Sequence, residues 1–213
     1  MKIWAIEAQK GGSGKTTTAV HMAVCAVQQG LKTALIDIDP QQSATKWNQS
    51  RAPEKRVDCI AGTAADVASF IEQARKGGID LVIIDTAPHS NAEAAIVAQL
   101  ADLVLIPCRP ARFDLDAIAS TLQIAQAAKT PAAIIINAAP RGRLAEEARA
   151  ALTSQGATVI ETVLHQRAAY SHAVIDGRSV HEYEPHGAAA AEIDQLYNHI
   201  TRLHGGKRPK VAA

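Results

Sequence analysis

Two lysines enclose a run of small residues near the start of the chain. Lys10 and Lys15 flank the sequence Gly-Gly-Ser-Gly, between an apolar run at residues 3–8 and a helical pattern at residues 16–29. A strand, a glycine-rich turn and a helix N-terminus together direct backbone N–H groups and the positive end of the helix dipole toward an anion. The spacing therefore predicts a phosphate-binding loop. Its residues are Gly11, Gly12, Ser13, Gly14, Lys15, Thr16 and Thr17.

The side chains of this loop predict a division of tasks. Lys15 is placed to reach the β- and γ-phosphates of a nucleotide, and the hydroxyl of Thr16 is placed to bind Mg²⁺. Gln9 stands where the usual pattern has its first glycine. An ordinary phosphate loop does not need Lys10, so the second lysine requires its own explanation.

Carboxylates end two of the apolar runs that follow. Asp37 and Asp39 close one run, and Asp85 follows four apolar residues in another. The two-residue repeat of a strand puts Asp37 and Asp39 on one side. We expect Asp37 and Asp85 to hold Mg²⁺ and Asp39 to orient or deprotonate an attacking water. Together with the loop, these acids predict phosphoryl transfer from a nucleotide.

Short apolar runs alternate with alanine-rich helical patterns along the chain. This alternation predicts an α/β fold, a doubly wound, mostly parallel sheet with helices on both faces. The expected strands are 3–8, 33–38, 57–61, 81–84, 103–107, 132–136 and 158–163. The expected helices are 16–29, 43–50, 64–76, 91–100, 114–129, 143–155 and 187–204. We expect one domain over residues 1–204 and a flexible basic tail over residues 205–213.

Composition narrows the functional classes. The 213 residues carry a net charge of +1, so no global field attracts nucleic acid, and any DNA contact needs a local basic patch. The three cysteines are far apart in the sequence and form no metal-binding pair, which favours buried thiols in a reducing compartment. The N-terminus lacks a signal peptide, and no apolar run approaches the ~20 residues of a membrane span. We therefore expect a cytoplasmic protein.

The motifs resemble the deviant Walker motifs of the ParA/MinD ATPases, a group within the P-loop NTPases. The similarity is greatest to short plasmid-partition ParA proteins that lack an N-terminal helix-turn-helix domain. It covers nearly the whole chain in the right order. It is carried by residues 9–17, 37–41, 83–88, 105–110 with 114–115, and 179–185.

The resemblance implies a dimeric switch. Lys10 matches the family's signature lysine, which reaches across a nucleotide-sandwich dimer to the partner subunit's phosphates. Lys15 and Thr16 match the Walker lysine and Mg²⁺ ligand, Asp39 the catalytic aspartate, and Asp85 the Walker B acid. The cofactors implied are ATP and Mg²⁺, with weak intrinsic turnover.

The partners implied by the resemblance are nucleic acid and protein. The ATP-bound homodimer would bind double-stranded DNA without sequence preference and associate with the nucleoid. A ParB-type centromere-binding or adaptor protein would stimulate hydrolysis. The function implied is DNA segregation or the positioning of another cargo, such as a protein compartment or a transfer complex.

Further polar residues could contact the base or DNA. Asn137 ends a predicted strand, where its amide could match the edge of adenine or serve as a turn residue. Basic residues of the C-terminal third could bind DNA backbone phosphates, or belong to a solvated surface. They are Arg167, Arg178, Lys207, Arg208 and Lys210.

Three alternatives compete with this interpretation. A MinD-like membrane cycle would need a membrane-binding final helix. That helix has an apolar face of Ile193, Leu196, Ile200 and Leu203, but a polar face with Glu192 in place of a run of lysines, so no membrane partner is expected. A metal-cluster carrier is disfavoured by the missing cysteine pair, and the spacing of the histidines suits no metal set. A monomeric ligase would show substrate-dependent turnover.

Overall fold

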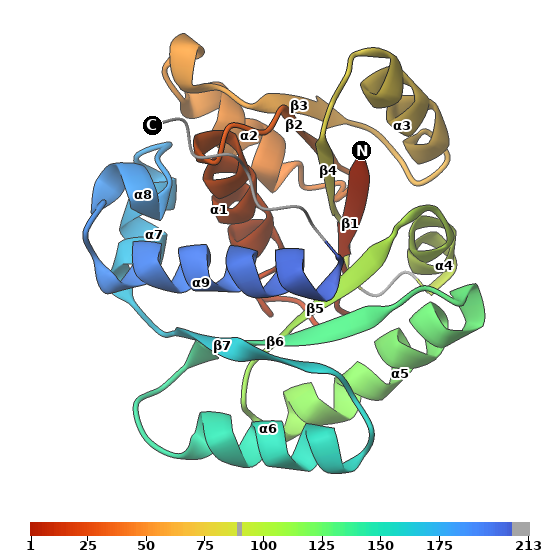
Figure 1. Ribbon diagram of the computed structural model, residues 1–213, viewed down its shortest axis with the longest axis vertical. Helices are drawn as coiled ribbons and strands as arrows, with labels where there is room; N and C mark the ends of the chain where they lie inside the picture. The colour runs from red at the N-terminus through yellow and green to blue at the C-terminus, as the bar shows by residue number, and fades with distance from the viewer. Residues whose placement is uncertain (89–90, 206–213) are drawn as a thin grey trace.

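The computed structural model describes residues 1–88 and 91–205. Within this part of the chain, seven strands form one sheet in the order β3-β2-β4-β1-β5-β6-β7 (Figure 1). Every strand pair in it is parallel. The strands are β1 (Lys2–Ile6), β2 (Thr33–Asp37), β3 (Asp58–Ala61), β4 (Leu81–Asp85), β5 (Leu103–Cys108), β6 (Ala132–Ala139) and β7 (Val159–His165).

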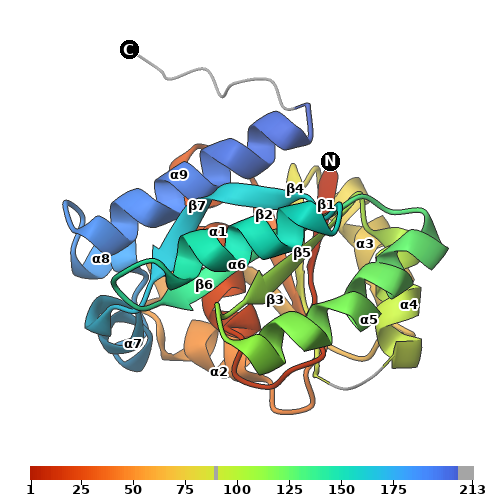
Figure 2. The ribbon, with the colours of Figure 1, turned by 90° about the horizontal axis from the view of Figure 1, so that it is seen from below.

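Helices cover both faces of this sheet (Figures 1 and 2). One face is covered by α1 (Lys15–Gln28), α2 (Ser43–Ser50), α7 (Ala168–Ile175), α8 (Val180–Tyr183) and α9 (Ala188–Leu203). The other is covered by α3 (Val67–Lys76), α4 (Asn91–Leu100), α5 (Arg112–Ala128) and α6 (Leu144–Ser154). The predicted doubly wound α/β fold is therefore confirmed.

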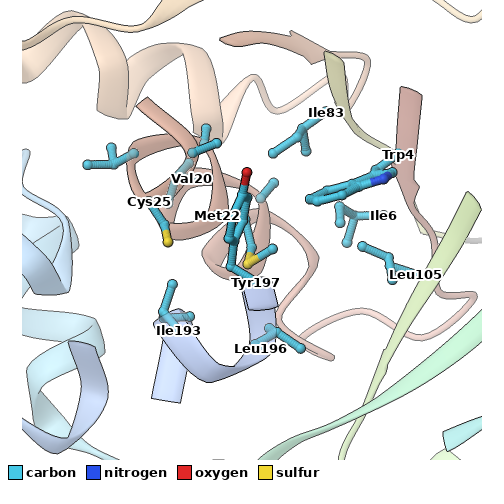
Figure 3. Packing of buried hydrophobic residues seen from close by; sticks show 14 of the residues in the cluster. Trp4, Ile6, Val20, Met22, Cys25, Ile83, Leu105, Ile193, Leu196 and Tyr197 are labelled. Carbon is cyan, nitrogen blue, oxygen red and sulfur yellow. The ribbon is translucent and has the colours of Figure 1, made fainter. Parts of the chain in front are cut away.

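The packing of α1 and α9 on the sheet forms the larger core. Trp4 of β1 and Tyr197 of α9 face each other with ring centroids 5.9 Å apart. Met22 of α1 and Leu196 of α9 are fully buried beside them (Figure 3). Since α1 begins at the phosphate loop, this core fixes the direction in which the loop faces.

The C-terminal third departs most from the prediction. The helices α7 and α8 were not expected, and Leu203 of α9 is 53% exposed, so the buried face of that helix ends at Ile200. Glu192, expected on the polar face of α9, is instead 8% exposed. Of the predicted tail, residues 206–213 lie outside the described part of the chain. No helix among the described residues is long and apolar enough to cross a membrane.

A buried ion pair ties α2 to α8. The guanidinium of Arg51 donates from Nη1 and Nη2 to the two carboxylate oxygens of Glu182, each at 2.9 Å. The same guanidinium lies over the ring of Trp47, 4.5 Å from its centroid. Such forked pairs fix geometry as well as charge. The segment that follows Asp39 is thereby held against the C-terminal helices.

Glu7 is a carboxylate buried directly after β1. Its side chain is 1% exposed, and neither oxygen has a hydrogen-bond partner among the described residues. Strand alternation puts it on the same face as Ile3 and Ala5, toward the core beneath α3, α4 and α5. Burial raises the pKa of Glu7 to about 8. The carboxyl group is therefore largely protonated at neutral pH.

This burial predicts a pH-dependent stability. Because the folded pKa lies near 8 and the usual value is 4.5, the folded state binds more protons than the unfolded state between these values. The free energy of unfolding should therefore fall as pH rises through this window. Glu7→Gln should reduce this fall and be more stable than wild type at the alkaline end, in thermal unfolding of the nucleotide-free protein from pH 5 to pH 9.

The exposed carboxylate of Glu54 provides the control. Glu54→Gln should keep the wild-type pH profile. Asp85 contributes in the same direction, so part of the slope should persist in Glu7→Gln. An unchanged slope in Glu7→Gln would contradict the assignment.

Candidate active site at the phosphate loop

The phosphate loop joins β1 to the first turn of α1. Gly12 and Gly14 take positive φ angles of 73° and 98°, a conformation that side chains disfavour. A Cβ at Gly14 would lie 2.0 Å from Nδ2 of Asn137, so only glycine fits beside that amide. The loop therefore needs glycine at position 14 for both its turn and its packing.

Lys15 lies buried at the start of α1. Its side chain is surrounded closely enough that burial lowers its pKa, while the charges of Asp85 and Asp39 oppose that shift. These three predicted residues therefore share one electrostatic environment. A buried ammonium at a helix N-terminus is suited to a phosphate group.

The two strand-end acids lie side by side. In the register of β2 and β4, Asp37 pairs with Asp85, and both are fully buried. Among the described residues, neither oxygen of Asp85 has a partner within hydrogen-bonding distance, although the Thr16 hydroxyl lies near enough to lower its pKa. Burial raises the pKa of Asp85 to about 7, and the negative charge of Asp37 acts in the same direction. The Thr16 hydroxyl and the charge of Lys15 lower this pKa and so offset part of the effect. Asp85 is an unsatisfied acid beside the loop hydroxyl.

A divalent cation fits this environment. Mg²⁺ prefers carboxylate and hydroxyl oxygens and is held by few protein ligands together with phosphates. The unpartnered oxygens of Asp85 and the neighbouring hydroxyl of Thr16 supply such ligands. The expected Mg²⁺ roles of Thr16 and Asp85 stay predictions that agree with the chemistry of the donors present.

Asp37 is already engaged by backbone groups. Its Oδ1 accepts the N–H of Asp39 at 3.2 Å, and its Oδ2 accepts the N–H of Thr45, in the first turn of α2, at 2.9 Å. The carboxylate therefore holds the segment between β2 and α2 in place. Its predicted role in Mg²⁺ binding stays a prediction, and its contact with Thr45 was not foreseen.

Asp39 is half-buried on this segment. Its Oδ1 accepts the N–H of Gln41 at 2.8 Å, and Gln42 takes a φ of 51°. The segment thus turns sharply after Asp39, and its carboxylate stays close enough to Lys15 to influence its charge. Asp39 is the acid of the site whose position depends on a turn and not on the sheet.

Lys10 lies half-buried at the head of the loop. With Ser13 it lines a small hollow that also includes Cys108 of β5 and Thr121 of α5. The head of the loop therefore lies beside β5 and α5.

An open cavity of about 730 Å³ adjoins the loop. Asn137 lines it together with Gly12 and Gly14, and its Nδ2 donates to the carbonyl oxygen of Ser13 at 2.6 Å. The amide therefore braces the loop. Contact with adenine is an additional role that stays a prediction. Arg109, not singled out as a site residue, also lines the cavity, in the loop that follows β5.

Glu192 holds together another part of the cavity lining. Its Oε1 accepts hydrogen bonds from Nε and Nη2 of Arg167 at 3.0 and 2.7 Å and lies 2.8 Å from Nδ1 of His165. Its Oε2 accepts the hydroxyl of Tyr170 at 3.1 Å. His165, Arg167 and Tyr170 all line the cavity. Helix α9 thus sets the shape of the wall through one buried carboxylate.

The predicted DNA contacts have different surroundings. The guanidinium of Arg167 is committed to Glu192, and that of Arg178 pairs with Asp176 and lies over the ring of Tyr183, 4.8 Å from its centroid. Lys207, Arg208 and Lys210 lie outside the described residues. Binding of DNA by any of them stays a prediction.

Sequence comparison places the chain among known nucleotide-binding proteins. The family model of the CobQ/CobB/MinD/ParA nucleotide binding domain matches residues 4–180. The chain is 30% identical over 208 residues to the maintenance of carboxysome distribution protein A of Halothiobacillus neapolitanus, covering 92% of this chain and 94% of that protein. It is 30% identical over 205 residues to the protein ParA of Rhizobium radiobacter, covering 91% and 92% of the two chains.

The fold has close counterparts among solved structures. The ATP complex of an aspartate-to-alanine variant of Cyanothece McdA superposes with a TM-score of 0.76 at 18% identity, covering 97% of each chain. This likeness concerns the fold. The family match and the two relatives establish that this chain is a member of the CobQ/CobB/MinD/ParA family of nucleotide-binding proteins, of the ParA/MinD ATPase type.

Proposed function

We propose that the protein is an ATP-hydrolysing switch whose ATP-bound dimer binds DNA and positions a cargo. The observation that carries this proposal is the pairing of a two-lysine phosphate loop with Asp85, a buried acid whose oxygens accept no hydrogen bond among the described residues. Such an acid is costly unless a charge compensates for it. Bound nucleotide and Mg²⁺ would supply that compensation, so the occupied site should be the more stable one.

The residues of one chain have separate roles in ATP hydrolysis. Lys15 and the loop N–H groups hold the phosphates of the chain's own nucleotide, and Thr16 and Asp85 hold Mg²⁺. When bound, Mg²⁺ offsets the negative charge of the phosphate oxygens. Asp39 orients a water for attack on the γ-phosphorus and accepts its proton. The bond from that phosphorus to the bridging oxygen breaks, and ADP and phosphate remain.

Lys10 would complete the site of the partner subunit. A lysine that contacts the γ-phosphate across a dimer interface makes dimerisation depend on that phosphate. This differential contact is what a ligand-driven switch requires. Hydrolysis would remove the contact and release the dimer, and weak intrinsic turnover would leave the timing to a ParB-type or adaptor protein.

The relatives support cargo positioning more directly than a particular cargo. One is named for the distribution of carboxysomes, and the other is named ParA. We therefore propose that this chain positions a cargo. The first candidate for that cargo is a plasmid, partitioned on nucleoid DNA. A MinD-like membrane cycle is the alternative, and the burial of Ile193, Leu196 and Ile200 against the sheet speaks against it.

Substitution of Lys10 tests the dimer. Wild type with ATP and Mg²⁺ should elute as a dimer in gel filtration and be retained on random duplex DNA, with retention falling as salt rises. ADP or no nucleotide should leave a monomer that is not retained. Lys10→Ala should still bind ATP but should neither dimerise nor bind DNA.

Lys76→Ala is the matched control, because Lys76 is an exposed lysine at the end of α3, on the opposite face from α1 and α9. It should behave as wild type. An ATP-dependent, DNA-bound dimer of Lys10→Ala would overturn the role given to this lysine, and a wild-type monomer with substrate-dependent turnover would favour a ligase.

Substitution of Asp39 tests the chemistry. Loss of a group that orients and deprotonates water typically costs about 10²-fold or more. Asp39→Ala should therefore bind ATP, accumulate the DNA-bound dimer and lose turnover by about that factor, measured as phosphate release over a long single-turnover incubation. Full turnover by this variant would exclude Asp39 as the group that orients and deprotonates the attacking water.

A further inference from the structure

A second cluster of chemically active side chains lies away from the phosphate loop. It comprises Cys25 of α1, His181 of α8 and Asp194 of α9. Cys25 is ten residues beyond Lys15, which corresponds to about 15 Å along the helix axis. The nucleotide chemistry proposed above uses none of these three groups. In the sequence they are far apart and follow no metal-binding pattern.

The three groups converge on one point. Nε2 of His181 lies 2.9 Å from Oδ1 of Asp194, and Sγ of Cys25 lies 3.5 Å from the same oxygen. The sulfur, the ring nitrogen and the carboxylate oxygen all lie within 4.8 Å of one another. Figure 3 shows the sulfur of Cys25 directed from α1 toward α9, beside Ile193.

These separations are near those of a tetrahedral zinc site. Zn²⁺ binds sulfur at about 2.3 Å and nitrogen or oxygen at about 2.0–2.2 Å, so ligand atoms around it lie roughly 3.3–3.6 Å apart. The 3.5 Å between Sγ and Oδ1 falls in this range, whereas the 2.9 Å between Nε2 and Oδ1 is the length of a hydrogen bond and would widen by a few tenths of an ångström around the ion. Thiolate, imidazole and carboxylate together form a ligand set of the kind zinc accepts.

The surroundings leave a fourth position toward solvent. The side chain of Asp194 is 45% exposed, whereas that of His181 is 8% exposed and Cys25 is fully buried. Three protein ligands and one water would complete a tetrahedron, with the water on the side of Asp194. Without a cation, burial and the nearby Asp194 raise the pKa of the Cys25 thiol. A dication at this point would stabilise the thiolate instead.

We propose that Cys25, His181 and Asp194 form a Zn²⁺ site that links α1 to the C-terminal helices α8 and α9. The site would add a cross-link between the helix that begins at the phosphate loop and the helix that carries Glu192. It does not depend on the proposed function, because it uses no nucleotide and no dimer.

Metal titration of the purified chain tests the site. The protein is first stripped with a chelator and then titrated with Zn²⁺ alone, in competition with a chromophoric chelator and without nucleotide. One equivalent should bind, and thermal unfolding should shift upward with added Zn²⁺. Co²⁺ in place of Zn²⁺ should give a thiolate-to-cobalt charge-transfer absorption.

Two variants and two controls identify the ligands. Asp194→Ala changes a partly exposed residue, and Cys25→Ser removes the sulfur. Each should weaken binding by at least about tenfold, the loss seen even when only a ligand's hydrogen-bond partner is removed. Cys59→Ser and the exposed His186→Ala should bind as wild type. Circular dichroism with cooperative unfolding confirms that each variant is folded.

Two outcomes would overturn the proposal. One is the absence of stoichiometric Zn²⁺ binding by the folded wild type, in which case the cluster is a set of ordinary hydrogen bonds. The other is equal binding by folded Asp194→Ala and wild type. Neither outcome bears on ATP binding or dimerisation.

Discussion

The burial of Asp85, whose oxygens have no hydrogen-bond partner in the described part of the chain, is the constraint on which the site depends. The parallel register of β1, β2 and β4 brings Asp85 beside Asp37 and the phosphate loop, at the carboxyl edge of the sheet. The sheet fixes the position of the Asp85 carboxylate but supplies no positive charge to compensate for its burial. Lys15 opposes the desolvation of Asp85 only in part, and the pKa of Asp85 remains raised. The fold therefore presents a site that a dication and phosphates would complete.

The carboxyl edge of the sheet also connects the phosphate-binding site to the C-terminal helices. Asp37 fixes the segment that bears Asp39, and the α2 helix that follows is tied to α8 through Arg51 and Glu182. On the other side, Glu192 of α9 holds the wall of the cavity. A change at the phosphate loop could thus reach the C-terminal helices through contacts in two directions. This connectivity suits a switch, in which a local change of charge must alter a distant surface.

Much of this arrangement followed from the sequence, because buried parallel strands and a glycine-rich loop leave strong local patterns. The strand ends at Asp37 and Asp85 came from that pattern. The helices α7 and α8 did not, since they are short and owe their place to tertiary contacts. Glu192 was assigned to a polar face because helical periodicity cannot reveal a carboxylate buried by partners from β7 and α7. Cys25, His181 and Asp194 meet only in the folded chain.

The central claim is that the buried acid at the strand end is neutralised by the bound cation and nucleotide. Calorimetric titration with MgATP at pH 7, in two buffers of different ionisation enthalpy, measures the protons exchanged on binding. Because the pKa of Asp85 is about 7 and a metal ligand must be deprotonated, binding should release about half a proton per chain. The same titration of Asp85→Asn corrects for the protons of the nucleotide itself. Equal proton exchange by wild type and Asp85→Asn would contradict the account.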